Sequence, residues 1–82
     1  MDIQETNQLI RSFQARYGEK EGLRIYMTVM PGILKDFNEM LKKSKEGDNI
    51  HEEYHIEGGK AAVILHGSKD QGEIKISSIK VI

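Results

Sequence analysis

The residues best suited to catalysis or metal binding are those at 51–55, which read His-Glu-Glu-Tyr-His. This order matches the zinc-hydrolase pattern H-E-x-x-H, and an alternative function is a minimal zinc hydrolase using His51, Glu52 and His55. The motif requires a helix, on which residues four apart lie about 6 Å from each other. On a strand, the two histidines would lie about 13 Å apart, too far for one ion. The third histidine position of the longer metzincin motif is Ala61.

A second group of potential metal ligands depends on how the C-terminal residues pair as strands. A two-residue turn at Gly58-Gly59 places His51 opposite His66, with Glu53 two residues along the same face. A following strand would add Glu73 opposite His66. Cross-strand neighbours stand about 5 Å apart, so two imidazoles and a carboxylate have the spacing to hold a divalent metal. A solvated polar face explains the same residues without a metal. His51, His66 and Glu53 are therefore candidate ligands only, and no cofactor is expected.

The lysines at 35, 42, 43 and 45 form the third group with possible chemistry, a basic edge for an anionic partner. They alternate with acidic residues, as on an ordinary solvated helix. The whole chain has 12 Lys and Arg against 13 Asp and Glu and a net charge of −1, which does not favour duplex binding. A nucleic-acid-binding module using the lysines of residues 31–46 remains an alternative.

Length and composition indicate the size of the domain and the compartment in which these residues would act. Eighty-two residues predict one domain with a small core. The chain has no cysteine, so neither disulfides nor thiolate metal sites can stabilise it. We therefore expect a reducing compartment, the cytoplasm, or support from a partner subunit. The opening residues lack the pattern of a secretion signal, and no stretch of 18 apolar residues occurs, so no membrane segment is expected.

Two segments have the periodicity of core-facing helices. In residues 2–17, apolar side chains recur at helical spacing and Gly18 follows as a typical stop. In residues 31–46, apolar side chains recur one, four, seven and eight positions apart, and three lysines near the end favour a helix C-terminus. Both helices should cover a sheet.

The segment between them, residues 23–29, has two interpretations. Its β-branched and aromatic residues favour a strand, and a boundary before Pro31 suits the restricted conformation of the preceding residue. The same residues also fit a helical stripe. We predict a strand at 23–29, and the alternative is one long helix from about Glu19, kinked at Pro31.

The C-terminal part changes to a period of two and predicts a three-stranded antiparallel meander with strands at 50–57, 60–66 and 73–82. The apolar alternation fixes the register, because a slip by one residue would scramble both faces. The phase breaks at Ser77-Ser78. Either a bulge restores it, which is the preferred interpretation, or the last residues turn to the opposite face. The second case would create a partner interface of Ile64, Ile79, Val81 and Ile82.

The predicted architecture is α+β, with two helices packed on one face of a small antiparallel sheet. For function, we expect a non-enzymatic cytoplasmic protein that acts by protein–protein binding, as a homodimer or a complex subunit. A regulator or inhibitor of a larger macromolecule fits this description by size. The expectation rests on the absence of a complete catalytic motif and on a small core without covalent staples.

Overall fold

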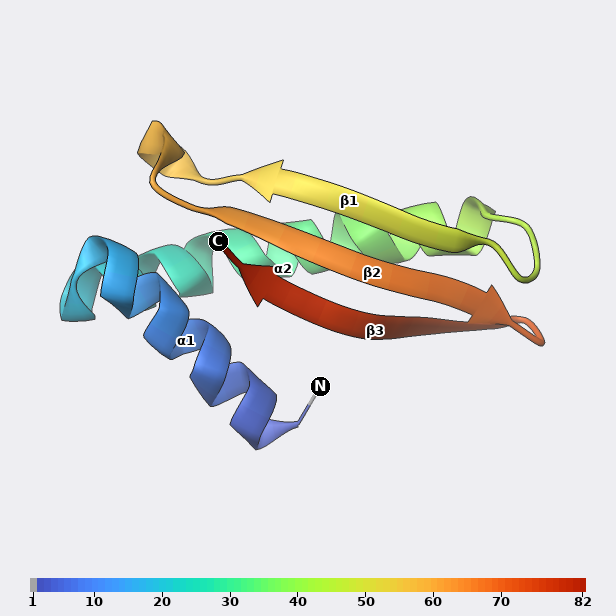
Figure 1. Cartoon of the computed structure of the whole chain (residues 1–82), viewed down its shortest axis with the longest axis horizontal. Helices are drawn as coiled ribbons and strands as arrows, with labels where there is room; N and C mark the ends of the chain where they lie inside the picture. The colour runs from blue at the N-terminus through green and yellow to red at the C-terminus, as the bar shows by residue number, and fades with distance from the viewer. Residues whose placement is uncertain (1) are drawn as a thin grey trace.

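The computed structural model describes residues 2–82 and has two layers, two helices packed on a three-stranded antiparallel sheet of order β1-β2-β3. Figure 1 shows α2 running behind the sheet and α1 lying beside β3. The predicted α+β architecture is confirmed. The elements in chain order are α1 (Ile3–Tyr17), α2 (Glu19–Lys43), β1 (Asn49–His55), a 3₁₀ turn (Glu57–Gly59), β2 (Ala62–Asp70) and β3 (Glu73–Val81).

The first helix lies where the periodicity predicts it. Asp2 caps it, since its carboxylate accepts a hydrogen bond of 2.8 Å from the Glu5 backbone N–H. At the other end Gly18 takes a φ of +95°, and it alone separates α1 from α2. Leu9 and Phe13 are the buried residues of α1. This single-residue connection folds the two helices against each other.

The predicted strand at 23–29 is wrong, because these residues belong to α2, which runs unbroken through Pro31. The long-helix alternative is the one observed. Ile25 and Met30 are buried in phase with Ile33, so packing of a continuous apolar stripe outweighs the local strand preference of the segment. The helix ends at Lys43, three residues before the predicted end, with Ser44 as its cap.

Close contact between α1 and α2 depends on Gly22. A Cβ atom placed there would lie 2.4 Å from the Cα of Gln14, so any side chain would push the helices apart. Phe13 and Tyr26 meet edge to face beside this crossing, with ring centroids 5.9 Å apart. The helices therefore form one tight unit that packs on the sheet.

The register of β1 and β2 is the predicted one, with His51 opposite His66 and Tyr54 opposite Val63. The turn differs. Instead of a two-residue turn at Gly58-Gly59, the chain makes a 3₁₀ turn, and the Ile56 N–H donates to the Ala61 carbonyl. The strands consequently stop short of the predicted 57 and 60. A longer loop with the same centre preserves the register.

The predicted strands at 60–66 and 73–82 leave residues 67–72 as a loop, and this prediction is also wrong, since β2 continues to Asp70 and the chain turns at Gln71-Gly72. Both turn residues have positive φ, as a two-residue hairpin needs. Gly67, which the sequence pattern assigned to the loop, is a buried strand residue. A Cβ there would lie 3.0 Å from the Phe37 ring, so the absence of a side chain at Gly67 allows α2 to pack closely on the sheet.

The predicted bulge in β3 is present. Gly67 pairs with Ile76 and His66 pairs with Ser78, which leaves Ser77 as the extra residue. Its hydroxyl donates a 3.1 Å hydrogen bond to the His66 carbonyl. The bulge restores the alternation, so all four isoleucine and valine side chains of β3 pack toward the helices.

The core lies between α2 and the sheet face that it covers, which we call the inner face. Phe37 and Leu41 of α2 meet Val63 and Leu65 of β2, and all four are 0% exposed. The other face of the sheet, the outer face, is not covered by either helix (Figure 1). Tyr54 also ties the layers, since its hydroxyl donates a 2.6 Å hydrogen bond to Asp36.

Candidate functional site

The residues of the H-E-x-x-H motif lie on a strand, not on a helix. His51 and His55 are both exposed on the outer face, four strand positions and therefore about 13 Å apart. Glu52 alternates to the inner face. A zinc site of the hydrolase type, with both histidines and the glutamate around one ion, is not formed in this geometry.

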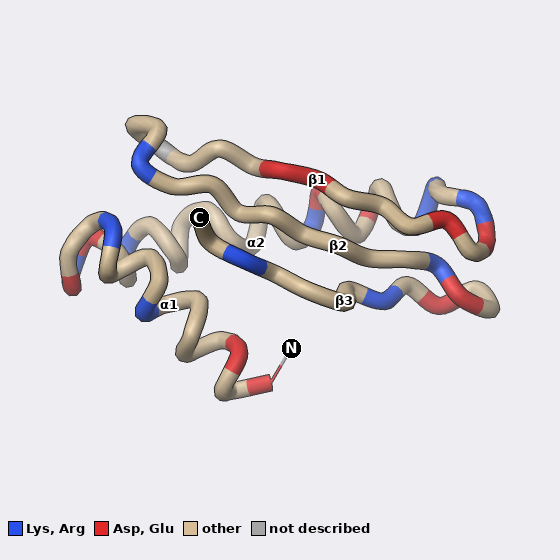
Figure 2. Tube along the Cα trace, in the orientation of Figure 1, with Lys and Arg blue, Asp and Glu red and all other residues tan. Residues whose placement is uncertain are grey.

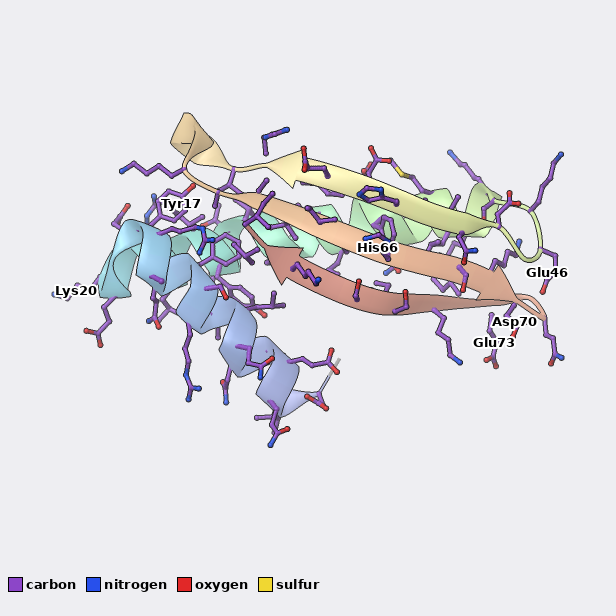
Figure 3. All side chains as sticks on the ribbon, viewed as in Figure 1. Tyr17, Lys20, Glu46, His66, Asp70 and Glu73 are labelled. Atoms are coloured by element: carbon purple, nitrogen blue, oxygen red, sulfur yellow. The ribbon has the colours of Figure 1, made fainter. Side chains whose placement is uncertain are left out.

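The predicted pairing of His51 with His66 is present and close. The two imidazoles stack with centroids 4.5 Å apart and planes 7° from parallel. Figure 3 shows His66 standing on the open side of the sheet. Both side chains are exposed. The hairpin register therefore brings together two potential ligands that lie fifteen positions apart in the sequence.

The carboxylates predicted around this pair are placed differently. Glu53 lies on the outer face, where its Oε2 is 3.1 Å from Nε2 of His55. Glu73 pairs with Asp70 at the β2–β3 turn, not with His66, as Figure 3 also shows. Within residues 2–82, no three or more His, Cys, Asp or Glu side chains are grouped as ligands for one metal ion. The histidine pair is thus a two-ligand arrangement.

The lysines of residues 31–46 do not gather into a basic surface of one sign. Figure 2 shows acidic and basic residues mixed around the end of the molecule where α2 stops and β2 turns. Lys69 donates to the Lys42 carbonyl there, and Glu46 accepts from the Gly72 N–H. These contacts join the end of α2 to the β2–β3 turn.

Of the four residues proposed from sequence as a partner interface, Ile79, Val81 and Ile82 line one hollow between α1 and β3, whereas Ile64 does not. Ile79 pairs with Leu65, and Val81 pairs with Val63, so both face inward. Ile64 alternates to the outer face. Ile82 lies beyond β3, where it exchanges two backbone hydrogen bonds with Ala62 and remains 54% exposed.

Sequence reasoning did not single out an exposed apolar stripe along α2. We call it the outer stripe, and it consists of Leu23, Met27, Pro31 and Leu34. These residues repeat at four, four and three positions and so lie on one side of the helix. Met27 is 66% exposed and Leu23 is 40% exposed. The helical spacing at 23–30 was the available signal, and the strand interpretation obscured it.

A shallow hollow opens along the outer stripe. It is lined by Tyr26, Met27, Met30, Pro31 and Leu34 and has a volume of about 460 Å³. Leu34 also lines the neighbouring hollow between α2, Glu5 of α1 and Ile76 and Ile79 of β3. The apolar surface of α2 therefore continues toward the half-buried isoleucines of β3.

The molecule as a whole exposes more surface than its mass requires. Its accessible surface is 5605 Å², whereas a compact monomer of this mass exposes about 5,000 Å². Its radius of gyration is 13.2 Å, against about 12 Å for a compact chain of this length. The cause is the flat shape, since the slab measures 40 × 25 × 17 Å.

Among the described residues, Tyr54 and Glu21 have shifted pKa values, and both shifts arise from structural contacts. Burial raises the pKa of Tyr54, and the neighbouring Asp36 carboxylate raises it further. The hydrogen bond from Arg24 lowers the pKa of Glu21, on the exposed side of α2. Neither group lies in the outer stripe or in the histidine pair.

Comparison of the chain with models of protein families, with curated proteins and with solved structures finds no match. In the part of the chain that the structure describes, neither helix is both long enough and apolar enough to span a bilayer. The candidate sites therefore have to be judged on their own geometry, and they are the outer stripe and the histidine pair.

Proposed function

We propose that this protein acts by binding other protein chains and that a second copy of itself docks on the outer stripe of α2. The exposure of Met27 and Leu23 beside the half-buried Leu34 is the observation that carries the proposal. Burial of such side chains against a partner is favourable, and it lowers the free energy by roughly 25 cal/mol for each Å² of apolar surface removed from water. Contiguous apolar patches on small proteins mark binding surfaces.

The excess surface of the chain is comparable to the area that one partner buries in a protein–protein interface. The chain exposes roughly 600 Å² more than a compact monomer. A standard interface buries about 800 Å² on each partner. Burial of the outer stripe and its margins in a dimer would bring the surface per chain close to that of a compact protein.

The outer stripe also suits two-fold symmetry. It extends along the middle of a 25-residue helix. In an antiparallel pairing of two α2 helices, the two-fold axis would pass between Met27 and Pro31. Met27 of each copy would then contact Pro31 of the other copy. The same surface then serves both subunits, as closed dimers require.

The middle of α2 carries a second sign of a role other than folding. Pro31 and Gly32 are the two residue types least suited to a helix interior, yet both lie there and both are exposed. A proline in this position removes one helical hydrogen bond. Such local conflicts are expected where a surface serves binding more than stability.

As a cellular role, we propose a non-enzymatic regulator or inhibitor of a larger macromolecule, working in the cytoplasm. The absence of cysteine fits a reducing compartment. The small size and the dimeric form suit a protein that presents surfaces to a partner.

The test is the mass in solution, measured by light scattering over about a thousandfold range of protein concentration. We expect the wild-type mass to approach that of two chains at the upper end. Met27→Glu should keep the mass at one chain throughout, because it places a charge in the apolar contact while glutamate remains a good helix former.

Thr28→Glu is the matched control. It adds the same charge one residue away, at an exposed position about 100° around the helix. Its mass should follow that of the wild type, and circular dichroism should give the same helix content for all three proteins. A wild type that stays at the mass of one chain, or a Met27→Glu variant that still dimerises, would contradict the proposal.

A further inference from the structure

The outer face of the sheet carries all three histidines of the chain, at positions 51, 55 and 66. This face lies on the side of the sheet away from α2 (Figure 1) and so is independent of the outer stripe. Two of the histidines differ from the third in their contacts. His55 is engaged with Glu53 at 3.1 Å, whereas His51 and His66 contact each other as a stacked pair.

The stacked pair is available for ligation. Both side chains are exposed. Within residues 2–82, neither imidazole makes a hydrogen bond or an ion pair with another side chain or with the backbone. No polar contact within the described residues therefore occupies a ring nitrogen of either histidine. Only stacking holds the two rings, and a rotation about their side-chain bonds would not break any polar contact.

The separation of the rings suits a shared ion. Metal–nitrogen bonds to imidazole measure about 2.0–2.1 Å, so two nitrogens on one ion lie about 3 Å apart. The centroids are 4.5 Å apart. In the stack the two planes are nearly parallel, so both rings would have to rotate about their side-chain bonds for one nitrogen of each to point at a common ion. The strand register fixes the two backbones, so the pair is held ready for binding.

We propose that His51 and His66 bind a divalent transition-metal ion of the zinc, nickel or copper class, as two protein ligands with the other coordination positions open. Imidazole is the ligand type that these ions share. The chain has no cysteine that would compete for them. Glu53 is a further carboxylate ligand on this face and lies diagonally from His66 in the register.

Binding at this pair would fasten β1 to β2. A ligand that binds only the folded chain raises its stability, and the metal would join residues of both strands. At a metal concentration of about 100 times the dissociation constant, we expect the melting temperature to rise by about 10 °C or more. Magnesium should give no shift, because it prefers oxygen ligands.

The test is calorimetric titration of tag-free protein with zinc chloride and with nickel chloride, together with thermal melts in the same buffers. We expect one ion to bind per chain. His51→Gln and His66→Gln should each weaken binding by at least about tenfold and abolish the thermal shift. Binding should also be lost in acid, because imidazole must be unprotonated to ligate.

His55→Gln is the matched control, since it removes the third exposed histidine of the same face but not the pair. It should bind as the wild type does. Glu53→Gln separates a two-ligand site, which it would leave intact, from a three-ligand site, which it would weaken. Equal weakening by all three histidine substitutions, or wild-type affinity in His51→Gln, would overturn the proposal.

Discussion

The two apolar stripes of α2 have similar composition and opposite environments. The inner stripe includes Ile33, Phe37 and Leu41, which are at most 8% exposed. The outer stripe includes Leu23 and Met27, which are at least 40% exposed. Met27 lies about 80° around the helix from Phe37. Leu23 lies on the same side as Leu41 but about five turns away, so both the angle and the position along α2 decide which residues the sheet covers. Apolar spacing therefore identifies the side chains that favour burial, whereas the shape of the fold decides which of them remain available to a partner.

Truncation of the inner stripe should have the largest effect. Phe37→Ala would leave a cavity between α2 and β2 and should lower the free energy of unfolding by about 3–5 kcal/mol. Small domains have total stabilities of about 5–15 kcal/mol, so the variant should be near unfolding. Urea denaturation followed by circular dichroism measures the loss. A loss below about 1 kcal/mol would mean that the inner stripe is not the core.

Removal of the helix breaker should act in the opposite direction. Pro31→Ala allows one more helical hydrogen bond and should stabilise the monomer, by up to about 3 kcal/mol. The experiment belongs in the Met27→Glu background, where the proposed dimer does not contribute. A thermal melt should show a rise of about 4–8 °C for each kcal/mol. A lower melting temperature would show that Pro31 supports the fold of the monomer.

Two glycines of α2 offer a matched pair at the next level. Gly22→Ala would drive a Cβ into the backbone of α1 and should cost about 1–3 kcal/mol, in spite of the better helix propensity of alanine. Gly32→Ala meets nothing within 4 Å and should add up to about 1 kcal/mol. Denaturant unfolding should show a lower free energy of unfolding for Gly22→Ala and a higher one for Gly32→Ala. A stabilising Gly22→Ala would contradict the close helix crossing.

Truncation of the outer stripe should have the smallest effect on folding. Met27→Ala should change the free energy of unfolding of the monomer by less than about 0.5 kcal/mol, because the side chain already lies in water. The measurement is denaturant unfolding at protein concentrations below those at which the chain associates. A large loss would place Met27 with the core.

Sequence reasoning predicted the parts of the fold in which a period was repeated and consistent. The two-residue period indicated the pairing of His51 with His66, since a slip by one residue would mix apolar and charged residues on both faces. The phase break at Ser77-Ser78 predicted either a bulge or a turn of the last residues to the opposite face, and the bulge, the preferred interpretation, is the one observed. The register follows from the local pattern, whereas the bulge serves the packing of β3 against the helices.

The errors occurred where one residue type serves two purposes. Gly67 was assigned to a loop, but its lack of a side chain admits Phe37 onto the sheet. Residues 23–29 carry both strand propensity and helical spacing, and only the tertiary contacts of Ile25 and Met30 decide between them. The outer stripe was missed for the same reason, because its spacing has meaning only within a helix.

Thiol labelling at position 27 tests the central claim most directly. The chain has no native cysteine, so Met27→Cys introduces a single reactive group in the outer stripe. We predict that its labelling rate falls as protein concentration rises, because a second copy covers it, while the rate for Thr28→Cys stays constant. A Met27→Cys thiol that reacts equally fast at every concentration would contradict the account.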